Sequence, residues 1–450
     1  MIESLVVEGI VLCGLALVAC FIAGRRSLTT GLGVLIGLGY GYGIIRANVP
    51  DSMTHFLFDA GAVGFYLSLI SRRMTSAQRR RVQVLMPWLA LLAGWPILLF
   101  FLPVQDPLVQ LVGLRGQIFF LPFLLVGAML ESEDYYVLAK WLAVLNLVAF
   151  GFAVAEYFEG LDSFFPRNAV TINMYGSRDL IGFTQYRIPS TFIGSASYCG
   201  AMVCTMPLLL DAWAQKRVGR LEYWLFMAAL VASPLGVFMG ASRSWAGIMI
   251  LAVGSTFLAG QMTFRVLLGS IALTICVGWI VSNNPRLQRF TTVQDTDMVE
   301  KRIAYSVNES FVDALHDYPM GNGLGGGGTS IPYFLQDRVK DSVTIENEYG
   351  RILLETGIPG LLIWLIFIFW TFARTVPDGE WVLALRLTRN VLAISFATAV
   401  IGTGLLTWIP GTPLVFAFMG WITTARARKP IVSRAEQRPP GVPAFATNPR

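Results

Sequence analysis

Residues 346–370, ENEYGRILLETGIPGLLIWLIFIFW, place a cluster of charged and amide groups directly before a long apolar run. The run is close to the ~20 residues that a helix needs to cross the hydrocarbon core of a bilayer. Ionisable groups at the mouth of such a segment are expensive to keep there, which makes them candidates for function. The stretch therefore predicts a transmembrane helix that carries a polar site at its N-terminal end.

The composition of the whole chain agrees with this stretch. Of 450 residues, 55% are hydrophobic and only 14% are charged, which excludes an ordinary soluble enzyme. About thirteen apolar runs approach spanning length, and they begin near Leu5, Leu28, Phe56, Val84, Leu108, Val137, Ala196, Tyr223, Trp245, Val266, Ile352, Val391 and Pro413. They lack the alternation of a membrane barrel, and backbone amides find no water in hydrocarbon. We predict an all-α polytopic membrane protein of about 12–13 transmembrane helices, of which the third and the last are the shortest.

Positive charge predicts the orientation. Basic residues recur in alternate loops, as the cytoplasmic side of a membrane protein requires: Arg25, Arg26, Arg72, Arg73, Arg79, Arg80, Arg81, Lys216, Arg217, Arg220, Arg374, Arg386, Arg389, Arg426, Arg428 and Lys429. This parity places the C-terminus inside, the N-terminus outside, and two long loops, residues 157–195 and 282–351, outside. If the last run does not span, the C-terminus moves outside. Sites are usually built on loops held by a rigid scaffold, so we expect the site on the outer face.

The chain divides into a membrane domain, residues 1–425, and a basic, proline-rich tail, residues 426–450. The tail has too little apolar surface to fold, which predicts a disordered cytoplasmic end near anionic lipid. The net charge of +6 comes mostly from this tail and the cytoplasmic loops, so it gives no reason to expect nucleic-acid binding.

Four arginines lie at the outer ends of apolar runs or in the outer loops: Arg115, Arg187, Arg243 and Arg302. Arginine presents a planar fork of donors that suits phosphate, so several arginines facing one outer cavity would form a diphosphate clamp. The alternative for each is that it reaches to the interface or pairs with a nearby carboxylate.

Other potential motifs point to structure rather than to chemistry. Residues 321–328, GNGLGGGG, follow no strand, so a flexible turn is favoured over a nucleotide loop. The five cysteines lie in or beside apolar runs, where they are expected to pack in the core. With two histidines, His55 and His316, we expect no zinc-type metal and no cofactor.

Four stretches, in order, resemble motifs of the bacterial O-antigen ligase and polymerase superfamily. They are RIPSTFIGSASYCGAM (residues 187–202), GASRSWAG (240–247), RIAYSVNESFVDALHDYPMGNGLGG (302–326) and ENEYGRILLETGIPGLL (346–362). In the first motif Ser190 stands where glycine is usual, and Ser195-Ala196 stand for Pro-Asn. One departure matters: Glu346 stands where ligases carry a histidine. Because polymerases vary more at the position of Glu346, the resemblance favours a polymerase over a ligase.

The resemblance implies a metal-independent glycosyltransferase of the bacterial inner membrane with a periplasmic active face. Its substrate would be an undecaprenyl-diphosphate-linked oligosaccharide, polymerised into an exopolysaccharide or O-antigen alongside other assembly and export proteins. Arg243 would act in catalysis with Glu346 and Glu348 as candidate bases. Substrate would be bound by Arg115, Arg187, Arg302, Asn347 and Tyr349.

Several alternatives remain open at the level of sequence. If the helix begins near Asn347, Glu346 and Asn347 can simply cap it, and Glu348 can pair with Arg351 three residues later. His316 is a further candidate base, although a structural role is favoured. A flippase that moves the same lipid-linked glycan, or a non-catalytic subunit of an assembly complex, would also use arginines to hold diphosphate.

Overall fold

The computed structural model describes residues 2–168, 170–171, 187–215, 218–258, 311–328, 331–343, 347–376, 379–402 and 404–425, with isolated positions at 300, 304 and 307. Within these residues every regular element is a helix, and eight helices are long and apolar enough to cross a membrane. The predicted all-α, polytopic membrane fold is therefore confirmed.

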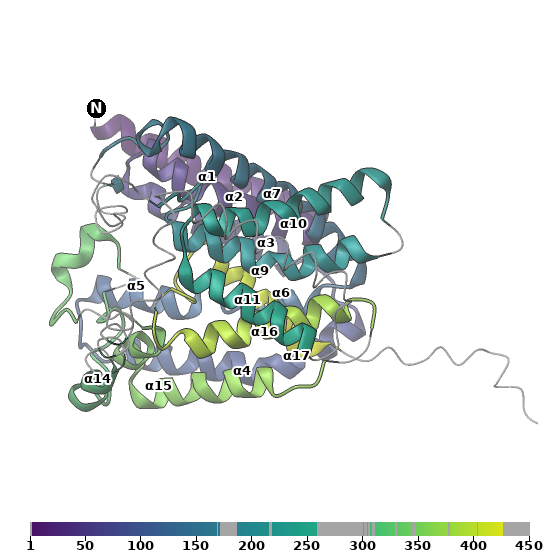
Figure 1. Ribbon diagram of the computed structural model, residues 1–450. Coiled ribbons are helices and arrows are strands. Elements are labelled where there is room, and N and C mark those ends of the chain that lie inside the picture. Colours follow the sequence, from purple (N-terminus) through teal and green to yellow (C-terminus); the bar gives the residue numbers. More distant parts are fainter. Residues whose placement is uncertain are drawn as a thin grey trace, which may run out of the picture.

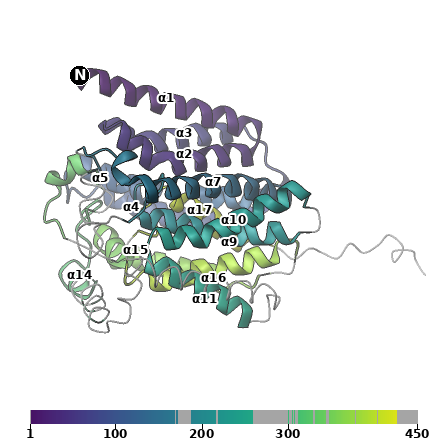
Figure 2. The same ribbon diagram turned by 45° about the horizontal axis from the view of Figure 1, so that its top comes forward.

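The helices lie side by side along one common direction (Figure 1), which a second view also shows (Figure 2). In chain order they are α1 (Ile2–Arg26), α2 (Leu28–Asn48), η1 (Ser52–Phe56), α3 (Leu57–Ile70), α4 (Ser76–Phe100), α5 (Pro107–Ile118), α6 (Phe123–Met129), α7 (Ser132–Glu159), η2 (Leu161–Ser163), α9 (Ser195–Ala214), α10 (Arg220–Met239), α11 (Arg243–Leu258), α14 (Asp313–Asp317), η5 (Tyr333–Arg338), α15 (Glu348–Phe372), α16 (Val382–Thr398) and α17 (Gly411–Thr424).

Each predicted apolar run coincides with helix, except the run near Val266, which lies outside the described residues. The eight candidate spans are α1, α2, η1 with α3, α4, α5 with α6, α7, α10 and α15. The other runs form α9, α11, α16 and α17, which are shorter or less apolar. The predicted tail, residues 426–450, also lies outside the described part of the chain.

Polar residues mark where several helices begin. The Ser27 hydroxyl accepts from the Thr30 amide at the start of α2 (2.9 Å), and Asp106 accepts from the Leu108 amide at the start of α5 (2.9 Å). Thr75 and Gln78 exchange side-chain and backbone hydrogen bonds in a capping box at the start of α4. Such caps satisfy backbone donors that the first turn leaves without partners, so each helix begins at the polar residue before its apolar run.

The bundle has two chemically different ends. At one, Arg25 donates to the Ser71 hydroxyl, Arg81 lies 3.8 Å from Glu131, and Arg374 donates to the Thr423 carbonyl (3.0 Å). We call it the basic end, because the arginines of the predicted cytoplasmic loops meet there. The opposite, loop end carries residues 187–194, 311–328 and 331–343, and the start of α15 (Figure 1). Which membrane side each end faces remains a prediction.

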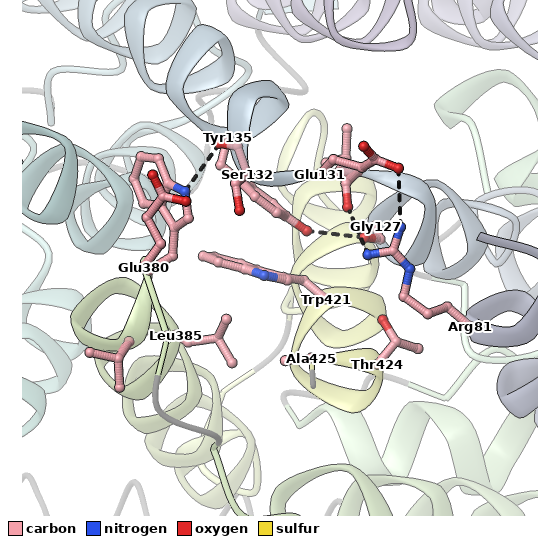
Figure 3. A pocket seen from close by; sticks show the side chains of 14 residues that line it. Arg81, Gly127, Glu131, Ser132, Tyr135, Glu380, Leu385, Trp421, Thr424 and Ala425 are labelled. Carbon is pink, nitrogen blue, oxygen red and sulfur yellow. Dashed lines mark hydrogen bonds and ion pairs between the residues drawn. The ribbon is translucent and has the colours of Figure 1, made fainter. Parts of the chain in front are cut away.

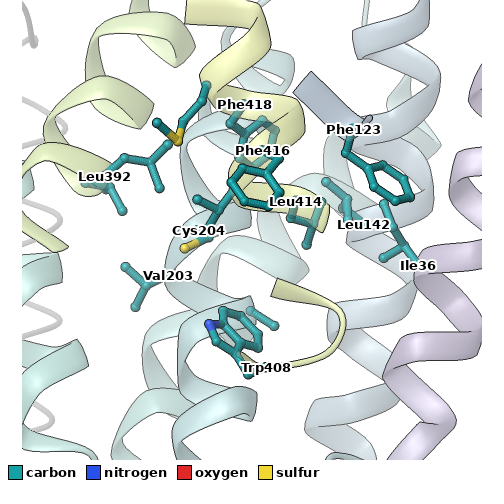
Figure 4. Packing of buried hydrophobic residues seen from close by; sticks show 14 of the residues in the cluster. Ile36, Phe123, Leu142, Val203, Cys204, Leu392, Trp408, Leu414, Phe416 and Phe418 are labelled. Carbon is teal, nitrogen blue, oxygen red and sulfur yellow. The ribbon is translucent and has the colours of Figure 1, made fainter. Parts of the chain in front are cut away.

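The last and weakest predicted span, α17, forms the centre of the bundle. All its residues are buried, and Leu414, Phe416 and Phe418 pack among side chains from the surrounding helices (Figure 4). A Cβ added at Gly127 of α6 would lie 1.8 Å from the Ala417 carbonyl oxygen, and one at Gly420 would lie 1.9 Å from the Leu124 oxygen. Glycine on both helices lets the backbones of α6 and α17 touch, which is a common way to pack helices in membranes.

Candidate functional site

The polar cluster of residues 346–355 lies at the loop end, where α15 begins. Asn347 is the N-cap, and its side-chain oxygen accepts from the Gly350 amide, so the capping role weighed for it is present. The Glu348 amide donates to the carbonyls of Ala399 (3.1 Å) and Gly402 (3.2 Å). The first residues of α15 are therefore fastened to the segment that follows α16.

A buried ion network follows on the same helix face. Arg351 Nε donates to Glu348 Oε1 (2.9 Å), and Arg351 Nη1 donates to Glu355 Oε2 (3.1 Å). The exposed fractions of Glu348, Arg351 and Glu355 are 0%, 2% and 0%. Gln117 of α5 donates to Glu355 Oε2 (2.5 Å), which ties α5 to α15. Spacings of three and four residues bring these side chains together on a helix, so the pairing weighed for Glu348 is confirmed.

The second oxygen of Glu348 is also occupied. Its Oε2 accepts from the backbone amides of Gly404 (3.2 Å) and Leu406 (3.3 Å). A carboxylate offers about four acceptor sites, and here two are taken by Arg351 and two by the backbone. These bonds leave no lone pair for the proton of a substrate hydroxyl. Glu348 therefore has a structural role: its carboxylate links α15 to the backbone of residues 404–406. Glu346, the other candidate base, lies outside the described residues.

The glycine-rich run, residues 321–328, forms the predicted turn, and it is packed rather than free. The Asn322 amide donates to the Leu354 carbonyl (2.6 Å), and the Ile358 amide donates to the Pro319 carbonyl (2.9 Å). These bonds meet at a kink in α15 where Gly357 has a φ of 68°. A Cβ at Gly357 would lie 2.7 Å from the backbone of Met320, so both backbone conformation and space favour glycine there.

Arg115 has a carboxylate partner. Its Nε lies 2.8 Å from Asp59 Oδ2 and its Nη2 lies 2.6 Å from Asp59 Oδ1, a two-pronged pair between α5 and α3. This is the alternative that the sequence left open for Arg115. The Asp59 carboxylate thus neutralises most of the positive charge of the Arg115 guanidinium.

Arg46, in the last turn of α2, is a charged residue that the sequence did not single out. It is only 8% exposed, its Nε has no hydrogen-bond acceptor, and no carboxylate of the described residues forms an ion pair with it. Its guanidinium lies 5.2 Å from the centre of the Tyr42 ring. A buried cation that forms no ion pair with a described carboxylate is costly to keep, so this position is the strongest candidate for binding an anion in the described part of the chain.

Other polar side chains lie near Arg46. Both Arg46 and Arg115 lie near enough to His55 to act electrostatically on its ring, and the buried His55 Nδ1 has no hydrogen-bond partner. The His55 carbonyl accepts from the Tyr42 hydroxyl (2.6 Å), which joins η1 to α2. The structure thus gathers two guanidinium groups, an imidazole and a phenol near the last turn of α2, η1 and the last turn of α5.

Arg187 belongs to a segment that packs on the end of α2. The Ile44 amide donates to the Thr191 carbonyl (3.0 Å), two residues before Arg46. Arg187 is half-buried, and its Nε has no acceptor. In the same segment Ser190 has a φ of 53°, and its amide donates to the buried carboxylate of Glu156 (3.0 Å). Glu156 therefore fixes the turn that follows Arg187.

The remaining candidates are placed as follows. Arg243 is half-buried at the start of α11, at the loop end but on the α9 side, and it engages other groups. The Tyr349 hydroxyl donates to the Phe396 carbonyl (2.7 Å), which ties α15 to α16. His316 is exposed on α14, and Arg302 lies outside the described residues. Arg115 and Arg46 both act on His55, and Arg187 lies four residues before Thr191, which bonds to α2 near Arg46. Asn347, Glu348 and Tyr349 lie at the start of α15.

Comparisons of the sequence with known families and with characterised proteins found no match to any family and no similar protein. The function must therefore be argued from the loop-end geometry and from the motif resemblance alone.

Proposed function

We propose that this protein transfers glycan repeat units from a lipid diphosphate carrier, as a polymerase that acts at the loop end of the bundle. The observation that carries the proposal is Arg46, a buried guanidinium without a carboxylate partner among the described residues. Such a group is stabilised by a bound anion, and a diphosphate at the membrane surface is an anion of suitable size and charge.

In this proposal the arginines stabilise the leaving group. The bond between the anomeric carbon of the growing glycan and its diphosphate oxygen breaks, and a hydroxyl of the acceptor sugar forms the new bond to that carbon. The negative charge that develops on the diphosphate is taken up by Arg46, with Arg187 and Arg243 as further donors. Fixed donors aimed at developing charge usually lower the barrier of such reactions more than any other effect.

The proton of the acceptor hydroxyl needs a base. Glu348 is held by four hydrogen-bond donors, so we assign it a structural role and keep Glu346 as the proposed acceptor. A single displacement with inversion requires no further catalytic group. The protein would then be a glycosyltransferase without a metal, a ligase being the alternative within the same chemistry.

A flippase is the rival from another class, since it would also hold diphosphate with arginines. Transporters commonly place their site near the middle of the membrane, between paired interrupted helices. Here Arg46 and Arg243 lie at the ends of α2 and α11, and the kinked helix α15 is anchored at its start by the Glu348 network. This arrangement favours an enzyme.

Reconstitution tests the proposal. Purified protein in liposomes is given a lipid-linked oligosaccharide, with neither ATP nor nucleotide sugar. An enzyme of the proposed kind lengthens the lipid-linked chains. Unchanged length with altered sidedness of the glycan would instead identify a flippase, and no change in either would identify a subunit without transport or transfer activity of its own.

A further inference from the structure

A second polar site lies at the basic end, opposite the candidate catalytic site. It is a pocket of about 140 Å³ between the ends of α4, α6, α7, α16 and α17. The charged and aromatic residues that line it are Arg81, Glu131, Tyr135, Glu380, Trp381 and Trp421. An apolar cavity of about 150 Å³ accepts one benzene-sized molecule, so the pocket has room for a small organic group.

The aromatic side of the pocket is rigid. Tyr135 stacks on Trp421 with ring centres 4.0 Å apart, and Trp381 lies 6.2 Å from Tyr135. The Tyr135 hydroxyl donates to the Gly127 carbonyl (3.1 Å), and the Trp381 indole donates to the Ser132 carbonyl (3.1 Å). The two hydrogen bonds hold Tyr135 and Trp381, and stacking on Tyr135 holds Trp421, so the rings at the pocket are fixed. Aromatic faces attract organic cations.

The charged side chains of the pocket lie on opposite sides of its aromatic rings (Figure 3). Figure 3 shows Arg81 on one side of the Trp421 ring and Glu380 on the other. The contacts of the two terminal nitrogens of Arg81 are long: 3.8 Å from Nη2 to Glu131 and 3.4 Å from Nη1 to the Leu130 carbonyl. Its guanidinium therefore retains donors for an anion.

From these features we propose that the pocket binds a zwitterion that joins an ammonium group to a phosphate, such as phosphoethanolamine. The ammonium group lies against Trp421 and the Glu380 carboxylate, and the phosphate lies against Arg81. Two carboxylates and one guanidinium disfavour a bare phosphate, and the guanidinium disfavours a simple amine. The ligand is either free phosphoethanolamine or the head group of a phospholipid at this membrane surface.

The test compares the wild-type protein with Glu380→Gln and with a control, Glu133→Gln, which removes an exposed carboxylate from the first turn of α7 outside the pocket. Binding of free phosphoethanolamine is followed by the shift in melting temperature in detergent. Retention of phosphatidylethanolamine against phosphatidylglycerol in mixed nanodiscs is followed by native mass spectrometry.

We expect the wild type and Glu133→Gln to bind alike and Glu380→Gln to bind at least about fivefold more weakly. Binding of the free compound would identify a soluble ligand, and retention of the lipid alone would identify a head-group site. Binding of inorganic phosphate as tightly as phosphoethanolamine would overturn the proposal. So would equal affinity of Glu380→Gln and the wild type, or the absence of both free binding and lipid preference.

Discussion

Glu348 and Arg351 form an ion pair that is sealed from solvent at the start of α15, and Glu348 uses its second oxygen to hold the backbone of Gly404 and Leu406. The pair joins three parts of the loop end: α15, the segment after α16, and, through Glu355 and Gln117, α5. Much of the polarity before the apolar run of α15 thus serves to position the loop end.

The first prediction concerns the stability that this network supplies. Arg351→Met leaves two carboxylates buried without their cation, and breaking a buried pair from one side costs about 3–5 kcal/mol. We expect a loss of that size in the free energy of unfolding in detergent. The control is Arg338→Met. The Arg338 side chain is 55% exposed and lies 3.8 Å from Asp106, so this variant should lose no more than about 1 kcal/mol. A loss for Arg351→Met as small as that of the control would contradict the structural role.

The kink in α15 gives a second prediction. Gly357→Ala forces a left-handed conformation on alanine, at about 1–2 kcal/mol, and drives its Cβ into the backbone of Met320. We expect a lowered melting temperature and a displaced glycine turn. Gly94→Ala, in the interior of α4 with no atom near the added Cβ, should be neutral or stabilising by up to about 1 kcal/mol. Equal melting temperatures for the two variants would show that the kink does not need glycine.

The two glutamates at the start of α15 should respond differently to amide substitution. In the reconstituted assay, Glu346→Gln should lower turnover by the ~10²–10⁴ of a general base while leaving the melting temperature unchanged. Glu348→Gln should instead lower the free energy of unfolding by about 1–3 kcal/mol, because a buried charged hydrogen-bond network is disturbed. Glu346→His is the complementary variant, and partial activity would show that the position needs a base of either kind. Near-normal turnover of Glu346→Gln would remove Glu346 from the mechanism.

Arg243 provides a test of the proposed clamp away from α2. Arg243→Ala should abolish chain elongation while the protein still inserts and folds. Arg243→Lys should recover only part of the activity, since an ammonium group is a point charge and cannot copy the two-pronged guanidinium fork. Initial rates at saturating lipid-linked substrate measure both. Full activity of the alanine variant would exclude Arg243 from diphosphate binding.

Local patterns in the sequence predict the helices. They also offer the cap at Asn347 and the pairing of Glu348 with Arg351 as alternatives to the expected binding and catalytic roles, because each depends on residues a few positions apart. They do not predict that α17 forms the bundle centre. Its apolar run is a weak candidate for a span because it is short. In the structure α17 is surrounded by other helices, so it does not need the length of a helix that contacts lipid along its whole surface.

The surroundings of Arg115 and Arg46 could not be predicted from local sequence patterns either. Asp59, the partner of Arg115, lies 56 residues away in the chain, and no periodicity relates them. In the sequence Arg46 has the pattern of an ordinary basic residue in the last turn of a helix, where a positive charge interacts favourably with the helix dipole. Its burial arises from packing at the C-terminal end of α2, where residues 187–194 dock and η1 is joined through Tyr42. This contact between segments distant in the chain leaves no local pattern in the sequence.

The proposed role of Arg46 is tested most directly by the chain length of lipid-linked product that Arg46→Ala makes in reconstituted liposomes. Arg73→Ala, which removes an exposed arginine at the basic end, is the control. We expect the wild type and Arg73→Ala to lengthen the chains, and Arg46→Ala to leave single repeat units while retaining its melting temperature. Arg46→Lys should give intermediate lengths. Product of wild-type length from a folded Arg46→Ala protein would contradict the claim that this buried guanidinium binds the diphosphate during glycan transfer.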